Sequence, residues 1–400
     1  MTRKKILIAS FDMAIGGVER SLIGLLNQID YSKYDVDLML FKHEGELFSL
    51  LPKGPNLLPE IKEYATFRKP IKQILREGNT PIGITRLLAK TTGELHGKYK
   101  KSVEPGYFVI QYGWRISLPF LPNLKEEYDV AISFLWPHYF IGNKVRAKKK
   151  IGWIHTDYSN IKLNKTMEYR MWKKIDHIVA VSEGCRDAFY ATFPNIHQKI
   201  EVIENIISSN FIYQQSKSDI ASEMIVNTKR IKILTVGRLS YAKGIDVAID
   251  VCKGLLEQGY NIEWYVVGYG SLEKELQGLI NKFNLQQRFF LLGKRVNPYP
   301  YIKTCDIYVQ PSRYEGKAIT VREAQILNKP VLITNFSTAK SQLQDGVDGY
   351  ICPMSVNGIQ EAIRKIIDDV QFRKTITEGT HRGDYTNSEE IEKLYKLIDY

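Results

Sequence analysis

Residues 231–257 read IKILTVGRLSYAKGIDVAIDVCKGLLE. The stretch begins with an apolar run, Lys232–Val236, which has the length of a buried β-strand. A loop that starts at Gly237 follows, and a helical pattern then extends from about Gly244 to Glu257. A strand that passes through a glycine-containing loop into an amphipathic helix is the repeating unit of a parallel α/β sheet.

The same alternation recurs on both sides of this stretch and predicts an α/β fold. Before residue 208 we expect strands at Lys5–Ser10, Val36–Phe41, Val130–Phe134, Lys150–Ile154, His177–Val181 and Ile200–Ile203. After residue 230 we expect strands at Lys232–Val236, Glu263–Val267, Arg288–Leu291, Asp306–Gln310, Pro330–Thr334 and Tyr350–Cys352. Residues 60–125 show no clear strand pattern, so we expect an insertion of helices and loops there.

The chain length and a polar stretch together predict two Rossmann-like domains. A chain of 400 residues is too long for one ordinary core. Residues 208–230 are polar and irregular, which is typical of a linker. We therefore expect one domain at 1–207 and a second at 208–386, with a helix at 387–400 that packs back on the first. Two such domains are expected to bring the carboxyl ends of their strands to a shared cleft, where ligands bind.

Composition excludes several classes of protein. With 44% hydrophobic and 25% charged residues, the chain is typical of a globular protein and not of a disordered one. No apolar run approaches the roughly 20 residues that cross a bilayer. The four cysteines are scattered without metal-ligand spacing, which argues against a disulfide framework or zinc site and indicates a reducing cytoplasm.

The charge is strongly basic and unevenly distributed. The net charge is +12, and residues 60–101 carry ten basic residues against four glutamates. Such a segment suits the anionic face of a membrane, a phosphorylated or polyanionic acceptor, or simple solvation. A nucleic-acid-binding protein is disfavoured, because no helix-turn-helix, RNP-type or zinc-finger pattern accompanies the charge.

The loop after strand Lys232–Val236 has the chemistry of a diphosphate site. Arg238 and Lys243 bracket it, and Gly237 and Gly244 allow the backbone to approach a ligand closely. Because the loop opens a helix, two cations and free N–H groups can converge on an anion.

A second loop, after strand Asp306–Gln310, places Glu315 and Glu323 eight positions apart around a helix start. Carboxylates accept strong hydrogen bonds from sugar hydroxyls. The intervening amides of Gly316, Lys317, Ala318 and Ile319 form a helix N-terminus, which favours phosphate.

Two further candidates lie in the first half of the chain. Gly16 and Gly17 form a turn between the first strand and helix, though without the dinucleotide-binding Gly-x-Gly-x-x-Gly pattern. His155 follows strand Lys150–Ile154, at the end of the sheet where ligands are expected.

Taken together, these motifs resemble glycosyltransferase family 4 (group 1) of the GT-B fold, in particular bacterial capsular and cell-wall polysaccharide enzymes. The resemblance implies an acceptor-binding domain at 1–207 and a nucleotide-sugar donor-binding domain at 208–386. It implies that Gly16 and Gly17 lie near the donor phosphate, that Arg238 and Lys243 hold the diphosphate, and that Glu323 binds the ribose. Glu315 would then bind the transferred sugar, and His155 would lie near the reacting centre.

The resemblance also implies a retaining reaction without a metal or other cofactor, the nucleotide-sugar (UDP-sugar expected) being a substrate. The acceptor would be a glycan, polymeric or polyprenyl-linked, and the enzyme would be cytoplasmic or peripheral on the membrane. This chain departs from the family where Glu204-Asn205-Ile206 replaces Pro-Asn-Gly, and where Asn335–Thr338 replaces a Gly-Gly turn. A sugar-nucleotide epimerase, a phosphorylase and a non-catalytic partner subunit stay open as alternatives.

Overall fold

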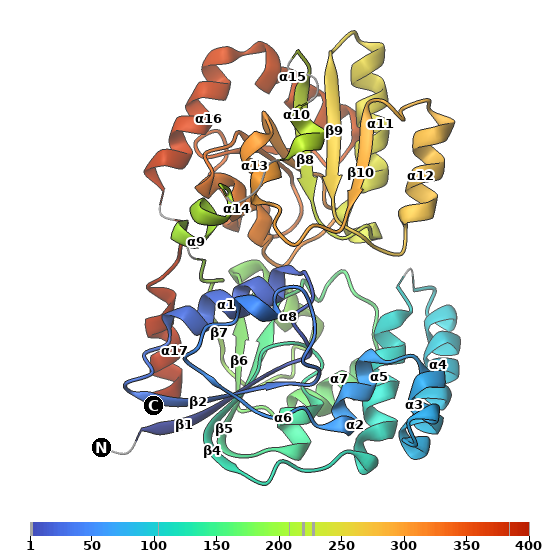
Figure 1. Cartoon of the computed structure of the whole chain (residues 1–400), viewed down its shortest axis with the longest axis vertical. Helices are drawn as coiled ribbons and strands as arrows, with labels where there is room; N and C mark the ends of the chain where they lie inside the picture. Colours follow the sequence, from blue (N-terminus) through green and yellow to red (C-terminus); the bar gives the residue numbers. More distant parts are fainter. Residues whose placement is uncertain are drawn as a thin grey trace. The chain divides into compact units, whose positions relative to one another are not determined.

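The computed structural model describes residues 3–102, 104–207, 209–217, 221–225, 229–383 and 385–399. The chain divides into two compact units, which Figure 1 shows in sequence colours. Unit 1 comprises Met1–Glu204 with Glu389–Tyr400, and unit 2 comprises Asn205–Ser388. Ile207 belongs to unit 2, because its side chain is buried in that core and its N–H donates to the Thr386 carbonyl at 2.8 Å.

The described part of unit 1 is built on a sheet of seven parallel strands, ordered β3-β2-β1-β4-β5-β6-β7. The strands are β1 Lys4–Ser10, β2 Tyr34–Leu40, β3 Asn56–Leu57, β4 Glu127–Ser133, β5 Arg146–Ile154, β6 His177–Ala180 and β7 Ile200–Val202. The α-helices are α1 Gly17–Gln28, α2 Lys62–Ala65, α3 Ile71–Arg76, α4 Thr80–Tyr99, α5 Gly106–Ser117, α6 Tyr139–Lys144, α7 Lys165–Trp172, α8 Glu183–Thr192 and α17 Glu390–Asp399.

The last helix, α17, returns to unit 1 and packs beside its first two strands. The ring of Tyr395 of α17 packs against that of Tyr34 with centroids 5.0 Å apart, and the Tyr395 hydroxyl accepts from the Asp30 N–H at 2.8 Å. Asp399 accepts from the Tyr34 hydroxyl and pairs with Lys4, both at 3.0 Å.

The described part of unit 2 has six parallel strands, ordered β10-β9-β8-β11-β12-β13. The strands are β8 Ile231–Val236, β9 Ile262–Val267, β10 Phe289–Gly293, β11 Ile307–Gln310, β12 Val331–Thr334 and β13 Tyr350–Cys352. The α-helices are α9 Ser209–Gln215, α10 Ser222–Ile225, α11 Ile245–Glu257, α12 Glu273–Lys282, α13 Tyr299–Thr304, α14 Ile319–Ile326, α15 Val356–Asp368 and α16 Val370–Arg382. Within the unit, the strand order is 3-2-1-4-5-6, the order of the Rossmann fold.

Alternation along β8 builds the two cores of unit 2. Ile233 packs with Ala248 and Ile249 of α11 on one face of the sheet. Leu234 and Val236 belong to the cluster on the other face. Because both faces of a parallel sheet are covered by helices, its strands are almost continuously apolar, which is the pattern the sequence shows.

The linker predicted at 208–230 is wrong for the residues that the structure describes there. They form α9 and α10, and Ile212 and Met224 are buried in the core of unit 2. The Tyr213 hydroxyl also donates to the Ile326 carbonyl at 2.6 Å. The polar residues of this stretch are the solvent-facing side of two short helices. Their few apolar residues are too sparse to show a helical period.

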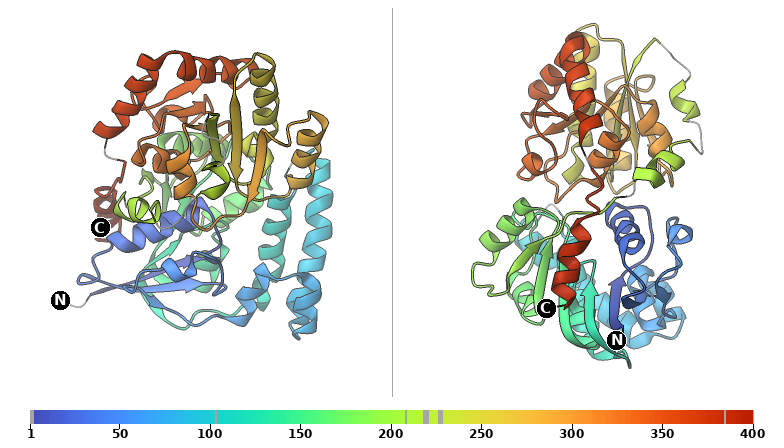
Figure 2. Two further views of the ribbon diagram at one scale, coloured as in Figure 1. Left: turned by 45° about the horizontal axis from the view of Figure 1, so that its top comes forward. Right: turned by 90° about the vertical axis from the view of Figure 1, so that its left-hand side faces the viewer.

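The insertion predicted at 60–125 consists of α2 to α5 with two single 3-10 turns. In the right-hand part of Figure 1 these helices, drawn in blue and cyan, lie to one side of the sheet of unit 1. Figure 2 shows α4 and α5, in cyan, side by side as the two long helices of this group. Among the described residues, no helix is long and apolar enough to cross a membrane.

Candidate active site

Two loops that the sequence singled out lie side by side in unit 2. Strand β8 pairs directly with β11, with Ile233 opposite Ile307. Residues 237–244 follow β8, and residues 311–318 follow β11. The strand order reverses between these two strands, and ligands of open α/β sheets bind at this switch point.

Arg313 ties the second loop to the first. Its guanidinium forms a two-pronged ion pair with Asp246, at 2.8 and 2.5 Å, and also donates to the Tyr241 carbonyl. Its backbone N–H donates to the Ala242 carbonyl at 2.7 Å. Burial alone would raise the pKa of Asp246, but the hydrogen bonds and charge of Arg313 hold this pKa below its usual value. The relative position of the two loops is therefore set by a charge-assisted contact.

Gly244 makes the close approach of the two loops possible. Its backbone lies in the left-handed region with φ 63°, and a Cβ there would come within 2.1 Å of the Pro311 carbonyl oxygen. A larger residue would strain the turn and push the loops apart.

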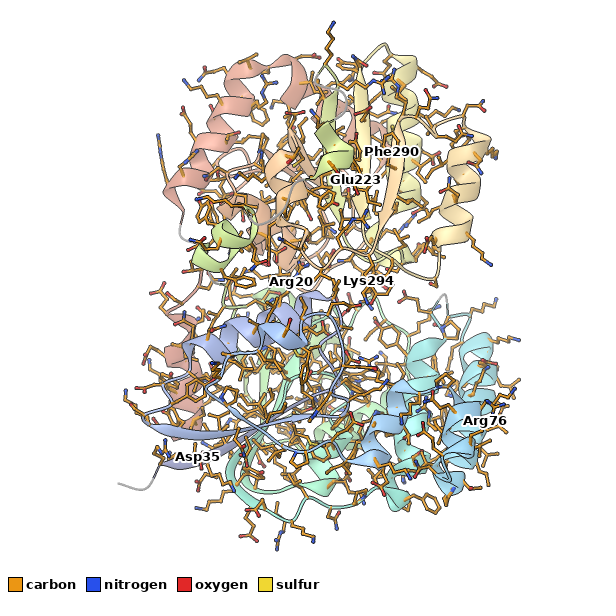
Figure 3. The ribbon with its side chains drawn as sticks, in the orientation of Figure 1. Arg20, Asp35, Arg76, Glu223, Phe290 and Lys294 are labelled. Atoms are coloured by element: carbon orange, nitrogen blue, oxygen red, sulfur yellow. The ribbon has the colours of Figure 1, made fainter. Side chains whose placement is uncertain are left out.

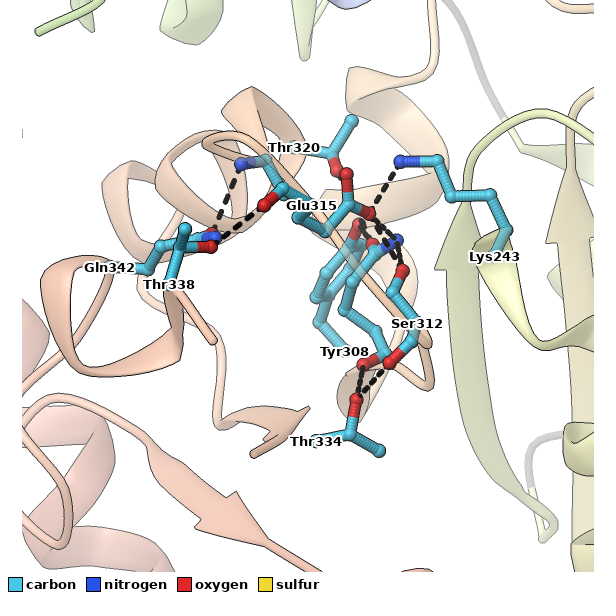
Figure 4. Close-up of polar contacts among 10 residues, drawn as sticks. Lys243, Tyr308, Ser312, Glu315, Thr320, Thr334, Thr338 and Gln342 are labelled. Carbon is cyan, nitrogen blue, oxygen red and sulfur yellow. Dashed lines mark hydrogen bonds and ion pairs between the residues drawn. The ribbon is translucent and has the colours of Figure 1, made fainter. Parts of the chain in front are cut away.

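The central contact of the site joins the two predicted residues Lys243 and Glu315. The Lys243 ammonium donates to Glu315 Oε1 at 2.5 Å, and both side chains are mostly buried. The Lys243 stem lies along Gly237, where a Cβ would meet its Cδ at 3.4 Å. Figure 4 shows Lys243 reaching over from the neighbouring loop toward the Glu315 carboxylate.

Glu315 is held by further hydrogen bonds from its own strand and loop. Gln310 Nε2 and the Ser312 hydroxyl donate to the same Oε1, at 3.1 and 2.7 Å (Figure 4). The Tyr308 hydroxyl in turn donates to Gln310 Oε1 at 2.7 Å, which orients the amide. Oε2 of Glu315 receives no hydrogen bond from the described residues. The carboxylate is thus fixed through one oxygen and can accept hydrogen bonds through the other.

Arg238 and Glu323 take contrasting positions. Arg238 is exposed, and its side chain makes no ion pair or hydrogen bond with the described residues. Glu323 lies one turn inside α14 and is 1% exposed, and its Oε1 accepts from the Tyr299 hydroxyl at 2.9 Å. A free cation near a partly paired one suits the binding of an anion that carries more than one charge.

Hydrogen bonds with Gln342 and Thr338 hold the loop that leads into α14. The Ala318 N–H donates to Gln342 Oε1 at 3.1 Å, and the Thr338 hydroxyl donates to the Glu315 carbonyl at 2.9 Å. Figure 4 shows both contacts. Lys317 and Ile319 are buried, and Gly316 is too. The Ala318 amide therefore already has a protein acceptor, and Thr338 belongs to the segment that replaces the Gly-Gly turn.

In unit 1, the Gly16-Gly17 turn leads into α1 as expected, but a carboxylate lies over it. A Cβ on Gly16 would come within 2.1 Å of Glu19 Oε2. Gly17 is the first residue of α1. Asp12, just before the turn, pairs with Arg68 at 2.5 Å. Glycine at position 16 thus makes room for Glu19, and the role of Gly16 and Gly17 toward a phosphate stays a prediction.

His155 lies directly after β5, where the sequence placed it. Burial lowers its pKa to about 3, although a hydrogen bond with the Phe134 backbone opposes that shift. Its Nε2 atom is buried and has no hydrogen-bond partner among the described residues. The imidazole is therefore neutral near pH 7.

Sequence reasoning missed Glu168 of α7, which orders the same edge of unit 1. Glu168 is fully buried, and burial raises its pKa. Its carboxylate accepts hydrogen bonds from four side chains, namely Gln111, Trp136, Tyr158 and Trp172, at 2.7 to 3.0 Å. The indole of Trp136, just beyond β4, is thereby fixed. A glutamate in a helical pattern carries no signal of burial, so this network could not be found from the sequence.

The comparisons with known proteins agree with this geometry. A model of the family described as "Glycosyl transferases group 1" matches residues 216–382, which include both loops of unit 2. Most of unit 2 thus matches the group 1 glycosyltransferases. Together with the curated relatives, this match identifies the chain as a glycosyltransferase, an enzyme that transfers a sugar. The expected resemblance to group 1 is confirmed, and the assignment to family 4 stays a prediction.

Curated relatives of this glycosyltransferase include enzymes of bacterial glycan synthesis. An N-acetylgalactosamine-N,N'-diacetylbacillosaminyl-diphospho-undecaprenol 4-alpha-N-acetylgalactosaminyltransferase of Campylobacter jejuni is 27% identical over 280 residues, 65% of this chain and 74% of that enzyme. The capsular polysaccharide biosynthesis glycosyltransferase CapM of Staphylococcus aureus is 28% identical over 234 residues, 55% of this chain and 61% of CapM. An uncharacterized glycosyltransferase of Methanocaldococcus jannaschii is 26% identical over 259 residues, and the match spans 57% of this chain and 64% of that protein.

Solved structures of glycosyltransferases share the fold of this enzyme. Anabaena Alr3699/HepE in complex with UDP and glucose has a TM-score of 0.69 at 17% identity, covering 99% of this chain and all of that one. TarM of Staphylococcus aureus has a TM-score of 0.69 at 15% identity, covering 100% of this chain and 99% of that one. The expected GT-B fold, with two Rossmann-like domains, is confirmed.

Proposed function

We propose that this glycosyltransferase transfers a sugar from a UDP-sugar to a polymeric or lipid-linked glycan in bacterial surface polysaccharide synthesis. The observation that carries the proposal is the cluster at the β8–β11 switch point. There, Lys243 and Glu315 meet from two loops, Arg238 lies in the same loop as Lys243, and Glu323 lies one turn inside the helix that follows Glu315.

The donor is assigned to unit 2. Arg238 is unpaired among the described residues, whereas Lys243 is paired with Glu315. A bound diphosphate would therefore pair directly with Arg238 and would compete with Glu315 for the ammonium of Lys243. Glu323 would bind the ribose, and the free oxygen of Glu315 would accept from the transferred sugar. A UDP-sugar is chosen because HepE, which shares the fold, was solved with UDP and glucose.

The reaction is assigned as retaining and independent of a metal. The bond between the sugar C1 and the β-phosphate oxygen breaks, and a bond from C1 to the acceptor oxygen forms on the same face. The leaving diphosphate gains negative charge, which Arg238 and Lys243 can stabilise as a metal ion would. A phosphate oxygen takes the acceptor proton, so no protein base is assigned.

The acceptor is assigned to unit 1, in which His155, the residue that the resemblance implies near the reacting centre, carries a neutral imidazole. A lipid-linked acceptor is supported by the name of the Campylobacter relative, and a capsular polymer by that of CapM. A position on the cytoplasmic face of the membrane would suit either acceptor.

A donor screen tests the function directly. We would measure binding by saturation-transfer NMR, and slow hydrolysis, for the common UDP-, GDP- and dTDP-sugars. The expected result is selective binding and hydrolysis of one UDP-sugar, with release of the sugar in its original anomeric form. Selective use of a GDP- or dTDP-sugar would refute the donor base, and release of the opposite anomer would refute retention.

A further inference from the structure

Helix α4 of unit 1 carries a row of exposed apolar side chains along one face. Ile84, Leu87, Leu88 and Leu95 are 51%, 51%, 52% and 67% exposed, and Tyr99 at the end of the helix is 81% exposed. At about 100° per residue, these five side chains project within roughly one third of the helix circumference. We call these five residues the α4 stripe. The same third of the helix also carries Thr91 and Lys98. Exposed leucines are common singly, but several exposed apolar side chains on one helix face mark an interaction surface.

The stripe cannot turn inward, because the other face of α4 is locked. Ile82 and Ala89 are buried there. Two glycines allow α5 to approach closely: a Cβ on Gly93 would meet Val109 Cα at 2.6 Å, and one on Gly97 would meet Pro105 Cβ at 2.7 Å. Any rotation of α4 would bring larger side chains into these contacts. The exposure of the stripe is therefore built into the packing of the two helices.

Exposed positive charge accompanies the stripe on the same helices. The exposed basic residues of α3, α4 and the turn that follows are Lys72, Arg76, Lys90, Lys98, Lys100 and Lys101. Of the nearby acids, Glu77 is already paired with Lys69 at 2.7 Å, and Glu94 is half-buried. Figure 3 shows Arg76 at the outer edge of these helices.

Part of the basic segment is not available to a partner. Arg68 pairs with Asp12, Lys69 pairs with Glu77, and the Arg86 guanidinium donates to the Thr66 carbonyl. Burial also lowers the pKa of Arg86. Apart from Lys62 of α2, the basic residues of the segment that stay exposed and outside these contacts lie on α3, on α4 and in the turn after α4.

We propose that the α4 stripe and its basic margin dock this enzyme on the surface of a membrane that contains anionic phospholipid. The leucines would enter the boundary between headgroups and acyl chains, while the lysines and Arg76 meet lipid phosphates. A second copy of the chain is a poor occupant, because it would bring two strongly basic surfaces together. A soluble polyanion would use the charge but not the leucines. The proposal is independent of sugar transfer, since docking needs neither donor nor acceptor.

Vesicle flotation with the full chain tests the proposal. The vesicles contain phosphatidylcholine alone or mixed equally with phosphatidylglycerol. We expect binding to the mixed vesicles at low salt and little binding to the neutral ones. The variant Leu88→Gln/Leu95→Gln keeps a good helix former at both sites and should lower the partition coefficient at least tenfold. Lys90→Gln/Lys98→Gln should lower it roughly fivefold per lysine, because each contributes about 1 kcal/mol near an anionic surface.

The matched control is Val296→Gln/Val370→Gln in unit 2, where the valines are likewise exposed. It should bind within twofold of wild type. If circular dichroism shows that the double leucine variant is misfolded, Leu95→Gln alone replaces it, with an expected loss of about threefold to fivefold. Absence of wild-type binding at low salt would overturn the proposal, as would equal binding of a folded leucine variant. A dimer in solution that the leucine variant dissociates, without vesicle binding, would assign the stripe to a second copy instead.

Discussion

Replacing Glu323 by glutamine should weaken the binding of UDP, the nucleotide of the proposed donor. Glu323 is 1% exposed, and the Tyr299 hydroxyl holds one of its oxygens at 2.9 Å, so the carboxylate cannot swing away to solvent. A hydrogen bond from a hydroxyl to a charged acceptor is worth about 1.5–3 kcal/mol. Since 1.4 kcal/mol corresponds to a factor of ten, Glu323→Gln should raise the Kd for UDP about tenfold to a hundredfold.

Calorimetry with UDP measures this change, and two variants serve as controls. Tyr299→Phe keeps the carboxylate and removes only its partner, so a change below about fivefold is expected. Glu315→Gln should leave the Kd for UDP nearly unchanged or lower it, because Lys243 loses its ion pair and becomes free for phosphate. The same variant should lose most of its transfer rate with the intact donor. If Glu315→Gln abolishes UDP binding while Glu323→Gln leaves it intact, the assignment of both carboxylates is wrong.

Three further predictions follow from the charges of the site and from the buried histidines. Arg238→Ala and Lys243→Ala should each lower the transfer rate about 10²-fold or more. Lys274→Ala, at an exposed lysine, serves as the control and should leave the rate unchanged. Full turnover in the double variant Arg238→Ala/Lys243→Ala would refute the diphosphate site. Transfer should persist in excess EDTA, and loss on chelation that Mn²⁺ or Mg²⁺ restores would contradict the metal-independent mechanism. Burial lowers the pKa of His138 and of His155 from 6.5 to about 3, so the unfolded chain binds protons that the folded chain excludes. Urea titrations should therefore show that the free energy of unfolding falls by about 1.6 kcal/mol per histidine between pH 6.5 and 5. His138→Gln should remove about half of this total fall, and an unchanged pH dependence would count against burial of a neutral imidazole.

Local pattern was enough to predict the architecture of this chain. The twelve expected strands all occur, with ends shifted by a few residues, because apolar runs, glycine turns and helical periods are properties of neighbouring residues. Strand β3, only two residues long, was missed for lack of any such run. The segment 208–230 failed for a related reason, since a short helix needs only one or two buried residues, such as Ile212 and Met224.

For the candidate site too, the sequence predicted some features and missed others. Arg238, Lys243, Glu315 and Glu323 were recognisable by residue type and spacing, because each follows a strand and precedes or enters a helix. Their partners were not. Tyr299 is 24 residues from Glu323, and the packing of α13 against α14 brings them together. Lys243 is 72 residues from Glu315, and the pairing of β8 with β11 brings them together.

The basic segment, residues 60–101, separates what the sequence decides from what the tertiary structure decides. The sequence by itself determined that residues 60–101 carry ten basic residues, and that helices would hold them. Only the tertiary structure decided that Arg68, Lys69 and Arg86 pair with acceptors of the same chain. Lys90 and Lys98, in contrast, stay exposed on the helix that carries the exposed leucines. The reason is physical: a charge is available to a partner only if folding brings no closer acceptor to it, and those acceptors come from distant parts of the chain.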